Sequence, residues 1–363
     1  MYRDAEAAEL AARLGTAAEP FVLDVREPSE FAAWSIPGAV NIPLDELAAR
    51  IAEVPADCEV VTVCATGNRS SSAAEVLSHD GRRAANLSGG MAAWALVYDS
   101  VTLELDGVRV VQVRRRGKGC LSYVVGAGDE AFVIDPSVDT AVYIRLADEH
   151  GWRITRVFDT HLHADHLSGA RLLSAEANAT LHLNPADPFE FAYEALGDGD
   201  RFELPGGAFV GVVAVHTPGH TRGSTTYVVS DQVALSGDTL FVESVGRPDL
   251  AERAEEFAHD LYRSLHDRVL SMSDDVLVLP GHYGSDVVVR PDRPVGASIG
   301  DLRSALAPLS YDEAEFVTWA TARSTPRPPN YVEIVQANLG RADVALAALR
   351  PLEVGPNRCS VSG

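Results

Sequence analysis

The sequence predicts an α/β protein of two domains, and three observations indicate this class. The chain has 363 residues, a usual length for two domains. Residues 1–98 alternate short apolar segments with segments of helical spacing, which is the rhythm of a parallel sheet flanked by helices. From about residue 101 the pattern changes to paired strands with helices between them, which favours two sheets packed between helices.

Each element of the N-terminal part follows from its local pattern. The first 15 residues place Ala and Leu between charges, which predicts a surface helix and lacks the apolar centre of a signal peptide. The apolar segments 21–25 (FVLDV) and 59–64 (EVVTVC) predict strands. Segment 44–54 (LDELAARIAEV) has helical spacing, and 71–81 (SSAAEVLSHDG) predicts a helix that ends at a glycine.

The second part begins after a boundary near residues 95–107. Segments 101–115 and 120–136 each predict a pair of strands, the second with a Gly-Asp turn. A helix over 139–152 and a strand over 154–160 follow. Four later segments are short, apolar and end near polar residues, which predicts further strands: GVVAVHT, TTYVVS, QVALSGD and VLVLPGH.

A long helix is predicted over 252–272, because apolar residues recur there at four-residue spacing and form one buried stripe: Phe257, Leu261, Leu265 and Val269. From about residue 290 the chain is rich in proline, and we expect a C-terminal appendage with helices. The predicted organisation is therefore an N-terminal domain over 1–98, a second domain over 105–290 and an extension of that domain over 291–363.

Charge and composition exclude several classes of partner. The formal net charge is -22, whereas a nucleic-acid binder needs Lys and Arg to neutralise phosphates, so we expect no nucleic-acid partner. No apolar segment approaches the ~18–20 residues of a membrane span, so we expect no membrane partner. The four cysteines are scattered, which indicates a reducing cytoplasm without a disulfide framework. A homodimer is compatible with the sequence.

Metal-ligand residues cluster after the predicted strand 154–160. The motif HLHADH places imidazoles and a carboxylate within six residues, at His161, His163, Asp165 and His166. Further candidates follow other strands, each beside a glycine that allows a tight turn: His220, Asp238 and His282. This clustering predicts a metal site rather than a set of ordinary loop histidines.

A thiol loop lies in the N-terminal part, where CATGNRS (64–70) joins a predicted strand to a predicted helix. Cys64 opens a six-residue loop that ends at Arg69 and contains Gly67. A helix N-terminus or a cation lowers the pKa of a thiol, and successive backbone N–H groups can bind an anion. The loop can therefore hold a cysteine persulfide, although Cys64 taken alone is more typical of a buried cysteine at a strand end.

The metal motifs carry a family resemblance. HLHADH, TPGHT, SGDTLF and PGH resemble the metallo-β-lactamase superfamily over about 105–290, which implies an αββα sandwich. Two relatives in that superfamily share nearly all of these ligands. Glyoxalase II holds two metals and hydrolyses a thioester, whereas persulfide dioxygenase holds one Fe(II) and oxidises a glutathione persulfide. The ligand residues alone do not decide between them, because all seven positions of the two-metal pattern are present.

The surrounding segments GRPD and RPPNYVEIVQANLG are similar to the persulfide dioxygenase family. This resemblance implies that His161, His220 and Asp238 bind Fe(II), as two imidazoles and one carboxylate form the facial triad of non-heme iron oxygenases. The remaining ligand candidates would orient this triad or belong to a second metal site: His163, Asp165, His166 and His282.

Two substrate contacts follow from the same resemblance. Arg247 of GRPD would bind the carboxylates of a glutathione-like thiol through its guanidinium fork. The family commonly has one residue between the late histidine and a substrate-contacting tyrosine, whereas His282 and Tyr283 are adjacent here. Tyr283 is therefore a substrate-contact candidate outside the usual spacing.

The segments that flank the thiol loop, DVREPSEFAAWSIPGAVNIPL and LSGGMAAW, look like a rhodanese domain over about 5–98. The resemblance implies that Cys64, with Arg69 in its loop, transfers sulfur between thiosulfate and a small thiol, and that Asp24 and Arg26 brace the loop. Cys120 lies near the expected metal site, where it is either a sulfur relay or, more simply, a buried core cysteine.

The combined hypothesis is a persulfide dioxygenase that converts a small thiol persulfide, O2 and water to sulfite and free thiol at one Fe(II), fused to a sulfurtransferase. The main alternative is a thioester hydrolase with two Zn ions and an accessory rhodanese domain. A docking or sensing role for the rhodanese domain is a third interpretation, and the intact Cys64 weighs against it. Neither the thiol carrier nor the direction of sulfur transfer follows from the sequence.

Overall fold

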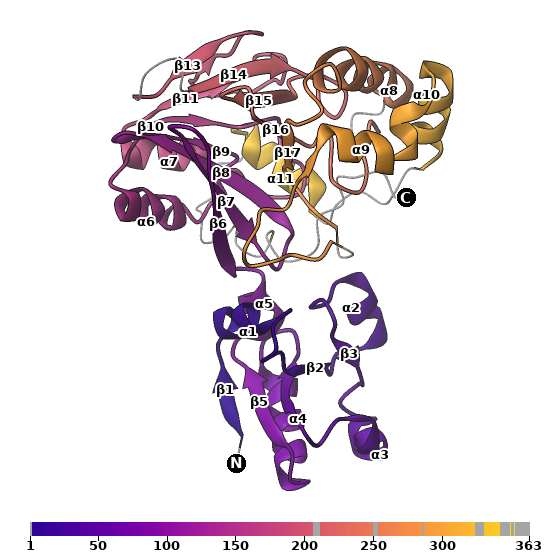
Figure 1. Ribbon diagram of the computed structural model, residues 1–363. Helices are drawn as coiled ribbons and strands as arrows, with labels where there is room; N and C mark the ends of the chain where they lie inside the picture. Colours follow the sequence, from indigo (N-terminus) through magenta and orange to yellow (C-terminus); the bar gives the residue numbers. More distant parts are fainter. Residues whose placement is uncertain are drawn as a thin grey trace. The chain divides into compact units, whose positions relative to one another are not determined.

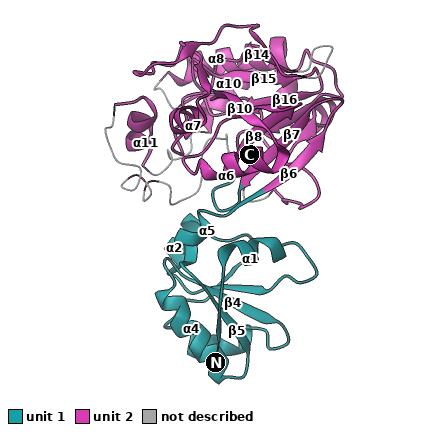
Figure 2. Cartoon of the chain, turned by 90° about the vertical axis from the view of Figure 1, so that its left-hand side faces the viewer, with its two compact units in different colours: residues 1–99, 115–119, 353–356 teal, residues 100–114, 120–352, 357–363 magenta. Residues whose placement is uncertain are grey.

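In the computed structural model the described residues are 2–205, 211–249, 253–284, 287–323, 330–341, 349 and 352. The chain divides into two units (Figure 2). The first contains residues 2–99 and 115–119, and the second contains 100–114 and the described residues from 120 onward.

The first unit is built on a parallel sheet of five strands in the order β1-β5-β4-β2-β3. These strands are β1 (Arg3–Ala5), β2 (Phe21–Asp24), β3 (Val40–Asn41), β4 (Glu59–Val63) and β5 (Arg83–Leu87). Alternating side chains enter two apolar clusters, since Val22 lies in one and Leu23 in the other, which places a core on each face of the sheet.

Short helices complete the first unit: α1 (Ala7–Arg13), α2 (Pro28–Ala33), α3 (Leu47–Arg50), the 3-10 turn η1 (Ile51–Glu53), α4 (Asn68–His79) and α5 (Gly90–Trp94). Two local predictions were wrong. Residues 3–5 form an edge strand beside β5 instead of the first helical turn, and the helix expected over 44–54 is one α turn followed by η1. The predicted strands 21–25 and 59–64 are confirmed to within one residue.

The second unit contains two sheets (Figure 1). The seven-stranded sheet has the order β12-β11-β10-β9-β8-β7-β6. Its strands are β6 (Tyr98–Glu104), β7 (Arg109–Arg115), β8 (Cys120–Ala127), β9 (Glu130–Ile134), β10 (Arg153–Phe158), β11 (Thr180–Leu183) and β12 (Glu194–Ala195). Strands β9 to β12 run parallel, while β8 and β9 form an antiparallel pair.

The six-stranded sheet has the order β13-β14-β15-β16-β17-β18. Its strands are β13 (Arg201–Glu203), β14 (Gly211–His216), β15 (Thr225–Val229), β16 (Val233–Gly237), β17 (Leu277–Pro280) and β18 (Ala297–Ser298). One apolar cluster joins the inner faces of both sheets, with Phe132 and Phe158 from one and Tyr227 and Leu279 from the other. The sequence-predicted α/β class with a parallel sheet followed by a two-sheet sandwich is confirmed.

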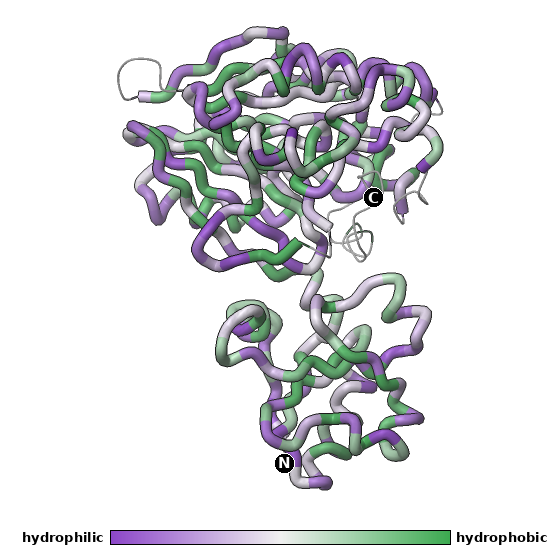
Figure 3. The backbone as a smooth tube through the Cα atoms, turned by 45° about the vertical axis from the view of Figure 1, so that its right-hand side comes forward, coloured by the Kyte–Doolittle hydropathy of each residue, from purple (hydrophilic) through white to green (hydrophobic). Residues whose placement is uncertain are grey.

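Helices lie on the outer faces of the two sheets. Helices α6 (Ala141–His150) and α7 (Ala170–Ala177) pack against β10, as Figure 1 shows. The other helical elements are α8 (Ala254–Arg263), the π-helical segment η2 (Ser264–Val269), α9 (Ile299–Ala305), the 3-10 turn η3 (Ala307–Ser310), α10 (Glu313–Ala322) and α11 (Tyr331–Asn338). Figure 3 shows that stretches of apolar and polar residues alternate along the chain in both units.

The predicted helical stripe of residues 257–269 is confirmed, because all four of its apolar side chains are buried. The helix changes from α to π geometry at Ser264. A strict four-residue spacing exceeds the 3.6 residues of an α turn, so the wider π turn keeps Leu265 and Val269 on the buried side. The segment expected to be an appendage also enters this core, where Ile299 and Phe316 join Leu261.

Within the described residues, no helix is both long and apolar enough to cross a membrane.

Candidate metal centre and thiol loop

The seven predicted metal-site residues follow the ends of four strands. HLHADH follows β10, His220 follows β14, Asp238 follows β16 and His282 follows β17. All seven are buried, each with at most 3% of its surface exposed. The fold thus buries these polar side chains, and a buried polar atom without a partner reduces the free energy of unfolding.

Three of these residues form a metal-binding group. The donor atoms of His161, His220 and Asp238 all lie within 4.8 Å of one another. Asp238 Oδ2 is 3.7 Å from His161 Nε2 and 3.5 Å from His220 Nε2. These three atoms have no hydrogen-bond partner. Because buried polar atoms are nearly always satisfied, the three orphaned atoms fit a cation that they would share.

Hydrogen bonds set the tautomers of the two imidazoles. The Thr160 hydroxyl donates to Asp135 Oδ2 at 2.9 Å, so it accepts a bond from His161 Nδ1 at 2.8 Å. His220 Nδ1 donates to the backbone oxygen of Arg247 at 3.0 Å. In both rings the proton lies on Nδ1, which leaves the Nε2 lone pair for a metal.

The protonation states agree with ligation. Burial lowers the pKa of His161 and of His220, which keeps both imidazoles neutral. Burial raises the pKa of Asp238. The nearby His282 and His161 rings lower it by more, so the pKa of Asp238 lies below its ordinary value. Two neutral imidazoles and one carboxylate are the form that a metal requires of these ligands.

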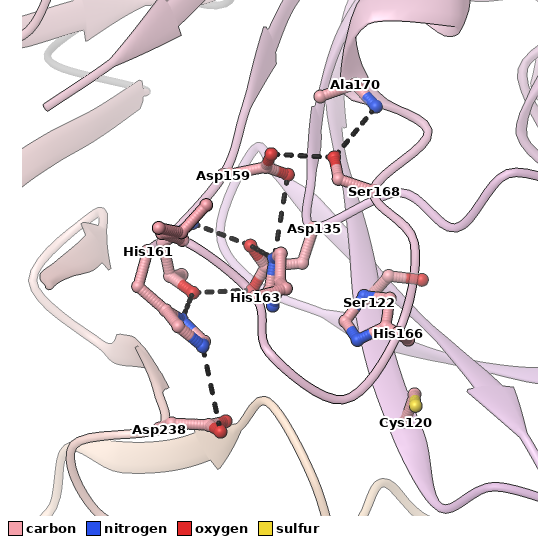
Figure 4. A network of polar contacts seen from close by, with 12 residues as sticks. Cys120, Ser122, Asp135, Asp159, His161, His163, His166, Ser168, Ala170 and Asp238 are labelled. Carbon is pink, nitrogen blue, oxygen red and sulfur yellow. Dashed lines mark hydrogen bonds and ion pairs between the residues drawn. The ribbon is translucent and has the colours of Figure 1, made fainter. Parts of the chain in front are cut away.

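Asp135 is a supporting residue that sequence reasoning missed. Its carboxylate accepts from Thr160 N at 2.6 Å and lies 3.1 Å from His163 Nε2 (Figure 4). The Nε2 atom of His163 therefore faces Asp135, and Asp159 Oδ1 lies 3.7 Å from the same atom. The available signal was the position of Asp135 at the end of the apolar strand β9, beside a proline.

His282, Asp165, His166 and Cys120 form a second group of possible ligands. His282 stands between two carboxylates, with Nε2 2.7 Å from Asp165 Oδ2 and Nδ1 2.7 Å from Asp238 Oδ1. His166 Nδ1 is 3.1 Å from Asp165 Oδ1. Nδ1 of His282 is hydrogen-bonded to Asp238, whereas its Nε2 has no hydrogen-bond partner although Asp165 Oδ2 lies 2.7 Å away.

Cys120 is buried, but its surroundings are polar rather than the expected apolar core. Its Sγ lies 3.9 Å from Asp165 Oδ2, and its backbone forms a bridge to His282. Burial raises the pKa of this thiol, but the His166 and His282 cations outweigh burial and bring it to about 6. Among the described cysteines, Cys58, Cys64 and Cys120 are all unpaired thiols, and Cys359 lies outside the described residues.

The guanidinium group of Arg247 forms an ion pair with Asp249. Its Nε and Nη2 donate to the two carboxylate oxygens of Asp249, each at 2.7 Å, and the side chain is buried. The backbone oxygen of Arg247 accepts a hydrogen bond from His220 Nδ1. Tyr283 lies in the apolar cluster between the sheets. The substrate contacts expected of both residues stay predictions.

Asp187 ties two metal-site loops together, and sequence reasoning missed it as well. Its Oδ2 accepts from Leu162 N at 2.9 Å and from the Thr221 hydroxyl at 2.8 Å, and its Oδ1 accepts from Gly223 N at 2.9 Å. Burial raises its pKa. The loop that carries His161 and the loop that carries His220 therefore share one buried carboxylate.

Asn338 connects the metal loop to helix α11. Its side-chain amide donates to the backbone oxygens of His163 at 2.9 Å and His166 at 2.8 Å, and its Oδ1 accepts from Ser168 N. Nothing near Asn338 in the sequence points to the metal loop, which lies more than 170 residues earlier.

In the first unit, backbone and hydroxyl donors surround the thiol of Cys64. Cys64 follows β4 and is buried, and its Sγ accepts from Gly67 N at 3.1 Å and from Ser70 Oγ at 3.3 Å. Helix α4 starts at Asn68, so its positive end is close to the sulfur. Burial raises the pKa of Cys64, but hydrogen bonds from Ser70, Thr66 and Gly67 outweigh burial, and the pKa lies below its ordinary value.

The arginines near the thiol loop are engaged by carboxylates. Arg69 donates to both oxygens of Glu30 at 2.8 Å, so its expected catalytic role stays a prediction. Arg26 forms a buried pair with Asp24 and donates to the Trp34 backbone oxygen at 2.6 Å. Asp24 and Arg26 thus brace the end of β2.

Comparisons with known proteins match both units. The metallo-beta-lactamase superfamily model matches residues 115–282, and the rhodanese-like domain model matches residues 6–96. An uncharacterized protein of Mycobacterium leprae is 33% identical over 47% of this chain and 88% of its own length. The mitochondrial persulfide dioxygenase of Homo sapiens is 28% identical over 60% of this chain and 82% of its own. A metallo-beta-lactamase from Staphylococcus aureus has a similar structure, with a TM-score of 0.60, 25% identity, and 66% and 74% of the two chains covered.

Proposed function

Because the chain belongs to the metallo-beta-lactamase superfamily and carries a rhodanese-like domain, we propose that it is a persulfide dioxygenase fused to a sulfurtransferase. The overall reaction is RSSH + O2 + H2O → RSH + SO3²⁻ + 2H⁺. The outer sulfur of the persulfide is oxidised and O2 is reduced. The human relative that bears the name persulfide dioxygenase supports this choice.

The group of His161, His220 and Asp238 carries the proposal. Two neutral imidazoles and one carboxylate, each with an unpartnered atom, are the donor set of non-heme iron oxygenases. Fe(II) bound there would supply the electrons that O2 activation requires. The protein's own contribution is to hold the two imidazoles in one tautomer, through Thr160 and through the Arg247 backbone oxygen.

The charge of His282 favours a single metal, because Asp165 and Asp238 outweigh burial and raise the pKa of this imidazole. In a two-metal enzyme this ring would be a ligand through Nε2, which lies 2.7 Å from Asp165 Oδ2 without a hydrogen-bond partner, while its Nδ1 is hydrogen-bonded to Asp238 at 2.7 Å. A protonated imidazole between two carboxylates neutralises charge that a second cation would otherwise neutralise. The Asp238 carboxylate then keeps one oxygen for His282 and the other for the metal group.

The thiol loop is the proposed sulfurtransferase site. The Cys64 thiolate would attack the outer sulfur of thiosulfate, so that Cys–S⁻ + S–SO3²⁻ → Cys–S–S⁻ + SO3²⁻. A small thiolate would then take the outer sulfur, which forms RSS⁻ and regenerates Cys64. The backbone N–H groups of Thr66 and Gly67 and the Ser70 hydroxyl are the donors that would stabilise the anionic sulfur. The reverse direction uses the same groups.

A thioester hydrolase with two Zn ions is the second candidate. The observation that favours it is the second group of ligands, Cys120, Asp165, His166 and His282, whose donor atoms lie within 4.8 Å of one another. A hydrolase would need both groups loaded, because metal-bound hydroxide is the attacking species in that chemistry.

Oxygen uptake separates the two candidates. The protein is purified without O2, loaded with Fe(II) and given glutathione persulfide, and sulfite is measured beside O2 consumption. We expect rapid uptake, with one sulfite formed per O2 and one iron per chain. Two zinc ions per chain, cleavage of a glutathione thioester and no O2 uptake would contradict the dioxygenase and favour the hydrolase.

A further inference from the structure

A row of polar side chains crosses the sheet of the first unit beside the first turn of helix α4. Asp4 on β1 lies directly opposite Asn86 on β5, and Asn86 lies directly opposite Thr62 on β4. Residues in register on neighbouring strands point to the same face of a sheet. Thr62 and Asn86 are buried on this face, whereas Asp4 is exposed on the edge strand.

Hydrogen bonds connect this row to the thiol loop. The Thr62 hydroxyl donates to the Ser70 backbone oxygen at 2.8 Å, which ties the first turn of α4 to β4. The Ser70 hydroxyl lies 2.7 Å from Asn86 Oδ1 and 3.3 Å from Cys64 Sγ. Asn86 Nδ2 donates to Asp4 Oδ1 at 2.9 Å. A network of Ser70, Asn86 and Asp4 therefore joins the buried sulfur to an exposed carboxylate.

Asp4 fixes the orientation of the Asn86 amide. An ionised carboxylate only accepts hydrogen bonds, so the amide nitrogen must face Asp4 and the amide oxygen must face Ser70. Because two acceptors cannot bond to each other, Ser70 must donate to this amide oxygen at their separation of 2.7 Å. The hydroxyl proton of Ser70 thus has a well-defined partner that is not the sulfur.

The Ser70 hydroxyl has more acceptors within reach than it can serve. It carries one proton, whereas Asn86 Oδ1 lies at 2.7 Å, Gly67 O at 3.2 Å and Cys64 Sγ at 3.3 Å. When Cys64 is a thiol, its S–H can donate to the Ser70 oxygen while Ser70 donates to Asn86. When the thiol loses its proton to solvent, the anionic sulfur attracts the hydroxyl proton, which must then turn away from Asn86.

We infer that Asn86 is a positioning residue of the thiol loop, which competes with the anionic sulfur of Cys64 for the hydroxyl proton of Ser70, and that Asp4 holds the Asn86 amide in the competing orientation. The competition opposes ionisation of the thiol, because ionisation leaves the buried Asn86 oxygen without its donor.

The competition ends once Cys64 carries a second sulfur atom. In Cys–S–S⁻ the charge lies mainly on the outer sulfur, so the Ser70 hydroxyl can return to Asn86. Asn86 therefore favours the persulfide over the bare thiolate. This role in sulfur transfer rests on the proposed function, whereas the competition for the proton does not.

The charged groups around the network form ion pairs of their own: Arg69 with Glu30, Arg26 with Asp24, and Arg3 with Glu9 and Glu59. None of these pairs includes Ser70, Asn86 or Asp4, so a substitution of Asn86 leaves them in place. A change in the titration of Cys64 in such a variant then reports on the hydroxyl proton.

Alkylation of Cys64 at different pH values tests the inference. In the full chain, the rate of modification by iodoacetamide is followed from pH 5 to 10 by mass spectrometry of the peptide that contains Cys64. In Asn86→Leu the hydroxyl proton is free for the sulfur, so the midpoint of the profile should move down by about 0.5–1 pH unit, the effect of one net hydrogen bond. An unchanged midpoint, or one that moves up, would overturn the inference.

A double variant separates this effect from a loosened fold. In Ser70→Ala/Asn86→Leu there is no hydroxyl proton to compete for, so the midpoint should equal that of Ser70→Ala. A downward shift that persists without the Ser70 hydroxyl would overturn the inference.

Asp4→Ala is an exposed change, so it tests the network even if Asn86→Leu fails to fold. Without Asp4 the amide can turn over and donate to Ser70, which frees the hydroxyl proton for the sulfur. The midpoint should therefore move down, by less than in Asn86→Leu. Glu75→Ala removes an exposed acid on α4 outside the network and is the control for lost charge. Equal shifts in Asp4→Ala and Glu75→Ala would contradict the role of Asp4.

Sulfur transfer from thiosulfate is measured on the same proteins. If no protein transfers sulfur, the proposed sulfurtransferase fails, while the alkylation midpoints still decide whether Asn86 competes for the proton. If transfer occurs, the acidic limb of its pH profile should move down in Asn86→Leu together with the alkylation midpoint. An acidic limb that stays in place would contradict a role of Asn86 in sulfur transfer.

Discussion

The thiol loop and the metal centre differ in how they position their reactive groups. The donors around Cys64 come from residues 66–70, and three of them are backbone N–H groups. The metal group takes side chains from three loops that span residues 161–238. A contiguous loop needs only local geometry, whereas the metal group needs two sheets to be correctly packed first.

This difference predicts how each site fails. The thiol loop should be sensitive to backbone changes and nearly insensitive to changes in the second unit. The metal centre should be sensitive to the residues that connect its loops, such as Asp187 and Asn338, even though neither belongs to the metal group.

The largest expected effect comes from removing one reactive group at a time. Asp238→Ala removes the carboxylate shared by the metal group and by His282, so O2 uptake and bound iron should fall to background while sulfur transfer stays normal. Cys64→Ser should abolish sulfur transfer from thiosulfate and leave O2 uptake intact. Both activities and the iron content are measured on each protein. If either variant lost both activities equally, the two sites would not be independent.

The next largest effect is expected from a substitution that displaces only the backbone of the thiol loop. A Cβ on Gly90 would lie 2.2 Å from the Cys64 backbone oxygen, so Gly90→Ala should displace the loop and reduce sulfur transfer about hundredfold. O2 uptake and iron content should not change. The control is Gly81→Ala, which has the same left-handed backbone but open space around the new methyl group. Equal loss in the two variants would attribute the effect to backbone strain and contradict the contact.

A smaller effect is expected at the residue that joins two metal-site loops. Asp187→Ala leaves Leu162 N and Gly223 N without their acceptor, so iron affinity should fall about 10–100-fold. Iron affinity is measured by competition with a chelator, and sulfur transfer serves as the internal reference. Asp148→Ala, an exposed change on α6, is the matched control. Unchanged iron affinity in Asp187→Ala would show that the loops hold without it.

The smallest effect is a pH shift at the thiol. The Ser70 hydroxyl is one of the donors that lower the pKa of Cys64, so Ser70→Ala should raise that pKa. The thiolate would then form at a higher pH, and alkylation by iodoacetamide would be slower near pH 7 but equal in both proteins well above the pKa. Rates are measured from pH 5 to 10, with the exposed Ser72→Ala as the control. An unshifted pH profile would assign the low pKa to the backbone donors alone.

Much of the fold and of both sites could be predicted from local sequence. Strands such as 59–63 and 153–158 are apolar and β-branched, and they end where the chain places its reactive residues. HLHADH and CATGNRS each concentrate their chemistry within seven residues. The first residues were misassigned as helix, because their Ala and Glu content favours a helix while pairing of Arg3–Ala5 with β5 decides the outcome.

Tertiary structure alone decided which partners these residues have. Arg247 pairs with Asp249 and Arg69 pairs with Glu30, partners that the motifs did not indicate, and the roles expected of both arginines stay predictions.

By itself, the sequence determined the α/β class, the positions of many of the strands and the candidate reactive groups, because these depend on residues close together in the chain. Only the tertiary structure decided that Asp135, Asp187 and Asn338 hold the metal loops. Their contacts join residues 25 to 175 positions apart, and only the packing of the complete second unit brings such residues together.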